Sequence, residues 1–497
     1  MADDVRRVAA IGAGVIGAGW VARFLLDGID VDVHDPSPGA AAAVDHALAN
    51  AERAWRKLTL APLPERGRLR FHDTVAAAVE GAQYVQESAP ERLDFKRRLL
   101  GEILAAAPAG TPVGSSTSGF TPSALRDGLG AGASRVFVAH PFNPVYLLPL
   151  VEVVGGEGAD DAALARAEAL FARVGMKPLR IAREIDAHVA DRLLEAVWRE
   201  ALWLVKDGIA TTEEIDDSIR FGFGLRWAQM GLFETYRIAG GAAGMRHFLA
   251  QFGPALKWPW TKLTDVPDLD DALVERIAAQ SDAQANGRSI AELEAKRDDN
   301  LVGILLALKA NDWGAGATLR ERDAALFGRV HARAAAAASS GSGPMASVTC
   351  RAREDWADYN GHMTESRYLQ VFGDATDAFL RAIGMDSAYL ASGRSVFTVE
   401  THLRHLDETK VGETLRVTTR LLARDSKRAH VAHEMRAGDD ARLVATAEQM
   451  LLHVDAKAGK ASAFDAALVA GLDAIARTQA GLPAPDWVGR KVGGPKA

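Results

Sequence analysis

The chain has 497 residues, which predicts two or three domains, and its 48% hydrophobic and 25% charged residues exclude global disorder. Lys and Arg number 58 against 65 Asp and Glu, and the net charge of -7 argues against nucleic acid or an anionic membrane as the main partner. The single cysteine, Cys350, excludes an intramolecular disulfide and a cysteine-built metal site, and with neither a signal-peptide layout nor a membrane-spanning apolar run we expect a cytoplasmic protein.

The first part of the chain alternates short β-rich runs with alanine-rich helical runs. This alternation predicts an α/β fold with a doubly wound parallel sheet over residues 1–186. The longer helical patterns that follow, such as 192–206 and 212–220, predict an all-helical domain over 187–330. The strands are expected at 5–11, 29–34, 84–87, 112–115 and 136–139, and the first helix at 15–27.

A glycine-rich turn separates the first expected strand from the first helix. Gly12 allows the tight turn, Gly14 lets the backbone approach a pyrophosphate, and Gly17 lets helix and strand pack closely. Asp35 ends the next strand, where its carboxylate can accept hydrogen bonds from both ribose hydroxyls and would repel a 2′-phosphate. The combination predicts a Rossmann-type dinucleotide site that binds NAD rather than NADP.

Polar side chains follow two later strands of the same domain. Ser115-Ser116-Thr117-Ser118 lies where one strand passes into a loop, and His140 opens the segment H-P-F-N-P after the next. Glu152 lies inside the apolar run L-V-E-V. A histidine with a buried carboxylate nearby predicts an oriented general base.

These segments, in this order, resemble the 3-hydroxyacyl-CoA dehydrogenase superfamily over residues 5–313. The resemblance implies that His140 is the catalytic base, that Glu152 holds and polarises its imidazole, and that Ser118 binds the reacting oxygen. It also implies that Glu91 and Lys96 lie near the nicotinamide ribose. The helical domain would then serve substrate binding and dimerisation.

One position departs from the family pattern. The superfamily has Asn in a G-F-x-x-N-R-L segment, whereas residues 187–193 read A-H-V-A-D-R-L, with Asp191 at the place of the amide. An anion at this place puts an acyl-CoA substrate in doubt and favours a cation, which also binds well against aromatic faces.

Two aromatic segments of the helical domain, 226–236 and 252–260, are similar to the L-carnitine dehydrogenase branch of the superfamily. Carnitine is a 3-hydroxy acid with a trimethylammonium group, so this resemblance agrees with the anion noted above. It implies that Phe142 and Phe252 form part of a cage for the cation. Arg192 and Arg226 remain alternatives as the donor to the substrate carboxylate.

The stretch 332–344, with alanines passing into Ser and Gly before Pro344, predicts a flexible linker at 331–345. The alternative is the end of a poly-alanine helix. The domain beyond it, 346–497, begins with a helical pattern over 365–383. Period-two runs then predict strands at 395–404, 414–424, 429–436 and 442–454, with a turn near Asp439, so we expect one long helix wrapped by a curved antiparallel sheet.

The segment D-x-x-G-H-M from Asp358 to Met363 resembles the 4-hydroxybenzoyl-CoA type of hotdog-fold thioesterases, over residues 347–455. The resemblance implies that Asp358 attacks the thioester or activates water, that Asn360 and His362 shape the loop, and that the next helix directs N–H groups at the thioester oxygen. Asp355 competes with Asp358, and a purely structural Asx-turn is the alternative. Hotdog sites are built across dimers, which implies a homodimer or larger assembly.

Together the resemblances imply a bifunctional enzyme with NAD as cofactor and no metal. It would oxidise L-carnitine to 3-dehydrocarnitine and hydrolyse betainyl-CoA to glycine betaine and CoA. A 3-hydroxyacyl-CoA dehydrogenase fused to an acyl-CoA thioesterase is the first alternative, and Asp191 counts against it. A non-catalytic, crystallin-like NAD-binding protein is the second, and the joint presence of Ser118, His140 and Glu152 counts against it.

Overall fold

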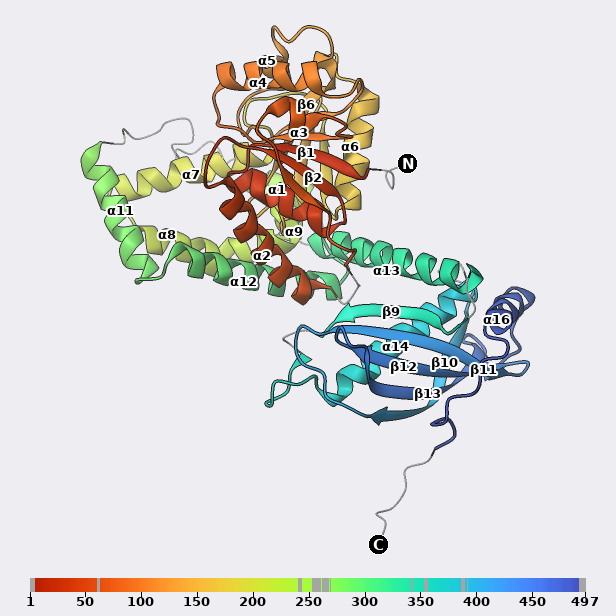
Figure 1. Ribbon diagram of the computed structural model, residues 1–497. Coiled ribbons are helices and arrows are strands. Elements are labelled where there is room, and N and C mark those ends of the chain that lie inside the picture. Colours follow the sequence, from red (N-terminus) through yellow and green to blue (C-terminus); the bar gives the residue numbers. More distant parts are fainter. Residues whose placement is uncertain are drawn as a thin grey trace. The chain divides into compact units, whose positions relative to one another are not determined.

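The computed structural model describes residues 5–490, with the exception of 60–62, 240–243, 253–260, 262–267, 269, 341–342, 353–355, 386–388 and 391. The chain forms two compact units, each with its own sheet (Figure 1). The first unit comprises Met1–Leu58 and Pro64–Arg322, and the second comprises Thr59–Leu63 and Asp323–Ala497. The first unit therefore contains both the sheet and the helical segment that follows it, up to Arg322.

The first unit contains an eight-stranded sheet in the order β3-β2-β1-β4-β5-β6-β7-β8. Strands β1 to β6 are parallel, as the alternating pattern predicted. Strand β7 pairs antiparallel with β6 and parallel with β8, so the last two strands run the opposite way. The strands are β1 Arg7–Ile11, β2 Asp30–His34, β3 Leu69–Phe71, β4 Val85–Glu87, β5 Val113–Ser115, β6 Val136–Pro141, β7 Leu150–Val154 and β8 Lys177–Ile181.

Helices cover both faces of this sheet (Figure 1). Trp20 and Phe24 of α1 and Phe171 of α6 pack with Tyr84 in one buried aromatic cluster. A separate core, which includes Leu100 of α4, lies between α3, α4, α5 and the strands. These helices are α1 Val15–Leu26, α2 Ala40–Leu58, α3 Val75–Val79, α4 Leu93–Ala106, α5 Pro122–Arg126 and α6 Asp161–Arg173.

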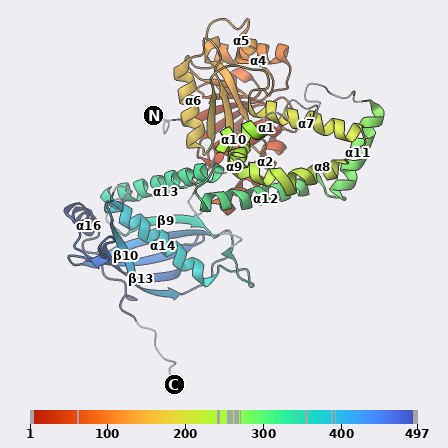
Figure 2. The ribbon, with the colours of Figure 1, turned by 180° about the vertical axis from the view of Figure 1, so that it is seen from behind.

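The chain beyond β8 is helical, as predicted. Helix α12 lies beside α2, which both ribbon views show (Figures 1 and 2). Among the described residues, no helix has the length and apolar character needed to cross a membrane. The helices of this part are α7 Ala190–Lys206, α8 Thr212–Ser218, η3 Ile219–Phe223, α9 Gly224–Ala239, α10 Gly244–Phe252, α11 Asp271–Ala285, α12 Ile290–Ala310 and α13 Ala315–Ser340.

The second unit is an antiparallel sheet that wraps one long helix. The strands follow the order β10-β13-β12-β11-β9, and β14 pairs with β13. Phe372 and Phe379 of the helix α14 are fully buried in the two cores of this unit. The predicted helix and four strands are confirmed, whereas β9 was not predicted. The elements are β9 Met345–Arg351, α14 Glu365–Ala382, β10 Arg394–His405, β11 Thr414–Arg424, β12 Arg428–Ala437, β13 Arg442–Asp455, β14 Lys460–Ala461 and α16 Ala466–Thr478.

The structure corrects the flexible linker predicted at 331–345. Helix α13 continues to Ser340, and β9 begins at Met345. The linker prediction is therefore wrong over most of its length, and the alternative of a poly-alanine helix end is correct. Alanine has the highest intrinsic helix propensity, so a run of alanines extends a helix that has already formed.

A buried polar network links α14 to the sheet of the second unit. His433 has no solvent exposure, and its Nδ1 lies 2.9 Å from Thr419 Oγ1. Its Nε2 lies 3.2 Å from Thr376 Oγ1 and 3.3 Å from Gln449 Oε1. Burial lowers the pKa of His433 from 6.5 to about 4, so the ring is neutral near pH 7.

This neutral histidine makes the second unit sensitive to acid. Below about pH 6.5 the unfolded chain takes up a proton that native His433 accepts only near pH 4, so stability falls as the pH falls through this window. We expect His433 to lower the free energy of unfolding by about 3 kcal/mol between these values. Calorimetry of the full chain at a series of pH values measures the effect. Loss of thioesterase activity identifies the unfolding transition of the second unit. His433→Gln should remove this drop, whereas His405→Gln, at an exposed site, should keep it. If the free energy of unfolding falls equally steeply with pH in both variants, the assignment to His433 is contradicted.

Candidate active sites

The glycine-rich turn joins β1 to α1, as predicted. Gly12 has a φ of +98°, which favours glycine, and a Cβ there would lie 2.6 Å from the carbonyl oxygen of Ser88. A Cβ on Gly17 would lie 1.9 Å from the carbonyl oxygen of Gly12. A Cβ on Gly14, which caps α1, would meet nothing within 4 Å. The turn is therefore crowded by its own backbone and open at the helix N-terminus, where a pyrophosphate would fit.

Substitution of these glycines separates folding from ligand binding. Gly14→Ala should leave the free energy of unfolding within about 1 kcal/mol of the parent, because Gly14 has an ordinary φ and open space. It should weaken dinucleotide binding about tenfold or more, because the new methyl group blocks the close approach of phosphate. Gly17→Ala should instead destabilise the first unit by about 3 kcal/mol through its backbone clash. Thermal unfolding and NADH fluorescence titration measure both effects; normal binding by the Gly14 variant would contradict this reading.

Asp35 follows β2 and lies beside the same turn. The backbone N–H of Ala13 donates to its Oδ2 at 2.6 Å, and that of Ser37 donates to its Oδ1 at 2.7 Å. These two hydrogen bonds fix the orientation of the carboxylate at the carboxyl end of β2. This position suits the ribose-binding role expected of Asp35.

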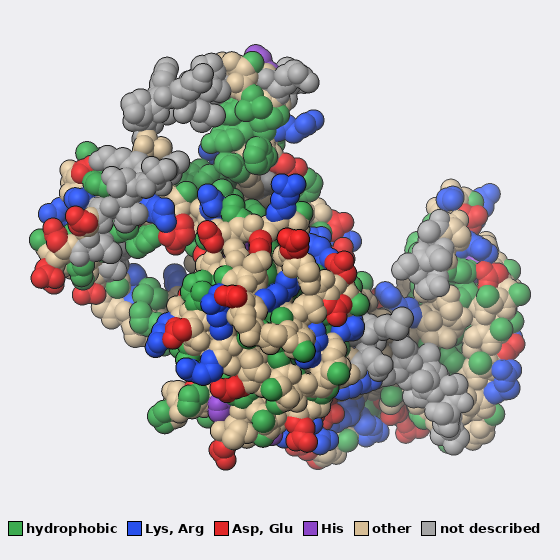
Figure 3. All heavy atoms as spheres, turned by 90° about the horizontal axis from the view of Figure 1, so that it is seen from above, with side chains coloured by type: hydrophobic (Ala, Val, Ile, Leu, Met, Phe, Trp, Pro, Cys, Tyr) green, Lys and Arg blue, Asp and Glu red, His purple; other side chains and the backbone are tan. Residues whose placement is uncertain are grey.

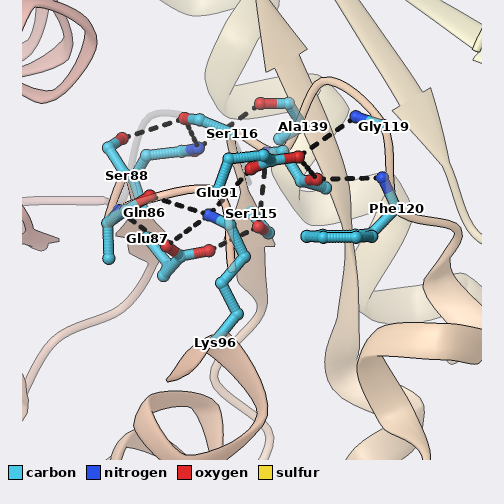
Figure 4. Close-up of polar contacts among 12 residues, drawn as sticks. Gln86, Glu87, Ser88, Glu91, Lys96, Ser115, Ser116, Gly119, Phe120 and Ala139 are labelled. Atoms are coloured by element: carbon cyan, nitrogen blue, oxygen red, sulfur yellow. Dashed lines mark hydrogen bonds and ion pairs between the residues drawn. The ribbon is translucent and has the colours of Figure 1, made fainter. Parts of the chain in front are cut away.

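A buried ion pair lies at the carboxyl end of β4 (Figure 4). Lys96 Nζ donates to Glu87 Oε1 at 2.8 Å and to the carbonyl oxygen of Ala89 at 3.0 Å, and Ser115 Oγ donates to Glu87 Oε2. The exposed fractions of Glu87 and Lys96 are 0% and 1%. Since the Lys96 ammonium lies inside this network, we interpret Lys96 as a residue that positions the loop around Glu91.

Glu91 itself is partly exposed and accepts several hydrogen bonds (Figure 4). Thr117 Oγ1 and the backbone N–H of Gly119, at 3.2 Å, both donate to its Oε1, and Lys96 Nζ lies 3.5 Å from its Oε2. Glu91 therefore joins the loop after β4 to the loop after β5. Sequence reasoning missed Glu87, although a Glu that ends a buried strand was a usable signal.

His140 and Glu152 face each other directly. The antiparallel pairing of β6 and β7 puts the two residues opposite each other in register, so their side chains share one face of the sheet. His140 Nδ1 lies 3.0 Å from Glu152 Oε2. Because Nδ1–H of His140 donates a hydrogen bond to Glu152, Nε2 of His140 is left as the basic nitrogen. The predicted pair is therefore in the geometry of an oriented general base.

Glu152 also holds the start of the helical part. Its Oε1 accepts the backbone N–H groups of Val189 at 3.0 Å and Ala190 at 2.9 Å. Burial raises the pKa of Glu152, but the hydrogen bonds from His140, Ala190 and Val189 outweigh this effect and leave the pKa below its ordinary value. The carboxylate thus stays charged and ties the imidazole of His140 to the N-terminus of α7.

Of the other predicted substrate residues, Phe142 contacts this pair. The ring of Phe142 packs edge-on against the ring of His140, with 5.0 Å between centroids. Ser118 is exposed in the loop after β5, and Asp191 is partly buried in the first turn of α7. Phe252 ends α10, but its side chain lies outside the described residues, as do residues 253–260.

Sequence reasoning missed a second histidine at this site. His188 is fully buried, and its ring centroid lies 5.5 Å from that of His140. Its Nε2 lies 3.0 Å from the carbonyl oxygen of Thr117. Burial lowers the pKa of His188, although the hydrogen bond to Thr117 raises it in part. In the sequence, the position of His188 within the A-H-V-A-D-R-L segment, just before α7 begins, could have identified it as a candidate site residue.

The second candidate site is the turn before α14. Asp358 Oδ1 accepts the backbone N–H groups of Asn360 at 2.8 Å and His362 at 3.2 Å. Gly361, with a φ of +79°, completes this Asx-turn. In the part of the chain that the structure describes, Oδ2 of Asp358 makes no hydrogen bond, so this oxygen can face a ligand while Oδ1 holds the turn.

Some residues near Asp358 are buried in the core, and others lie at the surface. Trp356 is 3% exposed and packs in the core. Tyr359 is 96% exposed, and His362 Nε2 lies 3.2 Å from Glu408 Oε2. The competing carboxylate Asp355 lies outside the described residues.

Comparison with known protein families agrees with both units. Residues 7–185 match the NAD binding domain of 3-hydroxyacyl-CoA dehydrogenase, and residues 188–272 match its C-terminal domain. Residues 352–472 match the thioesterase-like superfamily. The fold and the two sites therefore define a dehydrogenase of the 3-hydroxyacyl-CoA type joined to a hotdog thioesterase.

Relatives with assigned functions show to which family within this class the chain belongs. The "L-carnitine dehydrogenase/betainyl-CoA thioesterase" of Agrobacterium fabrum is 58% identical over 97% of each chain, and that of Rhizobium meliloti is 56% identical over 98% of this chain and 99% of its own. The chain belongs to this family of bifunctional enzymes. A solved NAD+-dependent dehydrogenase of a pyridine carboxylic acid (FHMPC) is similar in fold, with a TM-score of 0.52 and 26% identity over 61% of this chain and 99% of its own.

Proposed function

We propose that the first unit oxidises L-carnitine to 3-dehydrocarnitine with NAD as the hydride acceptor. The observation that carries this proposal is the His140–Glu152 pair, with His140 Nδ1 bound to the carboxylate and Nε2 left basic. Asp191 and the ring of Phe142 near this pair suit a cationic substrate better than an acyl-CoA. The names of the relatives support the same substrate.

In the proposed reaction Nε2 of His140 takes the proton of the 3-hydroxyl group as hydride leaves C3. Glu152 stabilises the imidazolium that forms, because its carboxylate already accepts the hydrogen bond from Nδ1–H. Ser118 donates to the reacting oxygen from the loop after β5. NAD, when bound, supplies the hydride acceptor, and Gly12, Gly14, Gly17, Asp35 and Glu91 are the residues that would hold it.

We propose that the second unit hydrolyses betainyl-CoA to glycine betaine and CoA through Asp358. The carboxylate would either attack the thioester carbon and expel CoA, leaving a mixed anhydride that water then hydrolyses, or take a proton from the water that attacks the thioester. Cys350 does not fit a nucleophilic role, because burial raises the pKa of its thiol to about 12. The two units would thus act on substrates with the same trimethylammonium group.

We propose a cytoplasmic homodimer. Strand β10 is an edge strand of the second sheet, and Phe397 and Val399 on it are each 53% exposed. Such an edge is normally covered or paired. Large apolar side chains are also exposed on the helical part of the first unit: Leu193, Leu194, Trp198, Phe221, Leu225 and Phe233. Analytical ultracentrifugation of the full chain tests the dimer, and a monomer at micromolar concentration would contradict it.

A substrate panel tests the two activities. The full chain should reduce NAD with L-carnitine and not with 3-hydroxybutyryl-CoA, prefer NAD to NADP, and release free thiol from betainyl-CoA. Activity with the hydroxyacyl-CoA alone would support the alternative of a 3-hydroxyacyl-CoA dehydrogenase with an acyl-CoA thioesterase. No turnover with any substrate would support the non-catalytic, crystallin-like alternative.

A further inference from the structure

Two imidazoles lie side by side in the first unit, and each has one nitrogen bound to a protein oxygen. His140 uses Nδ1 for Glu152, and His188 uses Nε2 for the carbonyl oxygen of Thr117. A carbonyl oxygen only accepts, so Nε2 of His188 carries the proton and Nδ1 is a lone-pair acceptor in the neutral ring. This Nδ1 is buried and has no hydrogen-bond partner among the described residues.

The backbone holds His188 in this place against its local preference. Ala187 and His188 have φ values of 60° and 50°, in the left-handed region that non-glycine residues seldom adopt. The segment is fixed on its other side by the hydrogen bonds of Val189 and Ala190 to Glu152, the same carboxylate that orients His140. Strain of this kind is concentrated at ligand sites.

A buried acceptor without a donor is costly, and a positive charge brought close to its lone pair lowers that cost. A quaternary ammonium suits such an acceptor, because it has no N–H and spreads its charge over its methyl groups. The charged and aromatic groups nearby agree: Asp191 is close enough to influence the titration of His188, and Phe142 packs against the neighbouring His140. Burial keeps His188 neutral, so the ring adds no repulsive charge.

We propose that the buried Nδ1 of His188 lies in the wall behind the subsite for the trimethylammonium group, where its lone pair attracts the cation, and, together with Phe142 and Asp191, makes the dehydrogenase specific for a cationic 3-hydroxy acid. The proposal rests on L-carnitine as the substrate of this site. It assigns His188 to substrate recognition, while proton transfer remains with His140.

The test compares L-carnitine with its neutral carbon isostere, 3-hydroxy-5,5-dimethylhexanoate, which has a tert-butyl group in place of the cation. His188→Gln keeps an N–H for Thr117 but removes the acceptor at Nδ1. We expect kcat/KM for L-carnitine to fall about tenfold, mainly through KM, while the value for the isostere stays the same or rises. His188→Asn keeps an acceptor oxygen near the place of Nδ1 and suits the left-handed backbone, so it should retain more of the preference for the cation.

The outcomes separate recognition from structure. An equal fall in kcat/KM for both substrates in both variants would show that His188 is structural. An unchanged ratio of kcat/KM for L-carnitine to kcat/KM for the isostere would show that Nδ1 binds water or nothing. Either result overturns the proposal. Thermal unfolding and NADH titration show whether each variant is folded. If the parent chain itself does not oxidise L-carnitine, the proposed function fails, whereas a normal parent with an unchanged ratio in the variants rejects only the role of His188.

Discussion

His140→Ala is expected to reduce NAD-dependent oxidation of L-carnitine by about 10²–10⁴-fold in kcat, because it removes the group that accepts the hydroxyl proton. Glu152→Gln should produce a loss of similar order. Its amide can still accept the N–H groups of Val189 and Ala190, but its NH2 group would face the Nδ1 proton of His140 and force the wrong tautomer. Stopped-flow and steady-state measurements of NADH formation give both values.

The second unit of the same chain provides the control for this prediction. Betainyl-CoA hydrolysis should be unchanged in both variants, since His140 and Glu152 belong to the first unit. NADH binding should also persist, because neither side chain is part of the glycine-rich turn. Oxidation at the parent rate by His140→Ala would rule out His140 as the base and make His188 the next candidate for that role.

Asp358→Asn is expected to lower betainyl-CoA hydrolysis by about 10²–10⁴-fold while the fold is preserved. The amide oxygen can still accept the N–H groups of Asn360 and His362, so the Asx-turn remains. The amide can neither attack a thioester effectively nor accept a proton from water. Thiol release, followed with a chromogenic disulfide, measures the loss.

The isosteric change distinguishes the catalytic role of Asp358 from the structural one. If the carboxylate served only as the acceptor in the turn, Asp358→Asn would retain activity and Asp358→Ala would lose both activity and stability. Equal activity of the parent chain and Asp358→Asn would therefore contradict the proposed thioesterase mechanism. Carnitine oxidation by the first unit serves as the internal control.

The parts of the fold that sequence predicted best are those fixed by local chemistry. Gly12 and Gly17 are required by close backbone contacts, so their spacing identified the turn, and the period-two runs identified β10 to β13. The pair His140 and Glu152 was found because the strands around them are short and apolar.

The parts that sequence missed depend on contacts between distant segments. His188 becomes a site residue only because two left-handed residues turn its ring toward His140. The role of Lys96 follows from its ion pair with the buried Glu87, a contact between side chains of a strand and a helix that the sequence does not place together. The linker prediction rested on the Ser and Gly that follow the alanines, but the helix propensity of alanine extends α13 to Ser340.

The pairing of β6 with β7 has a consequence for how this enzyme could change. The distance between His140 and Glu152 is set by strand register, not by the loop from Phe142 to Pro149 that joins the two strands. Substitution of Phe142 at the start of that loop can therefore alter the substrate while the proposed proton-transfer pair stays aligned. In this hairpin, substrate preference and acid–base chemistry can evolve, or be engineered, separately.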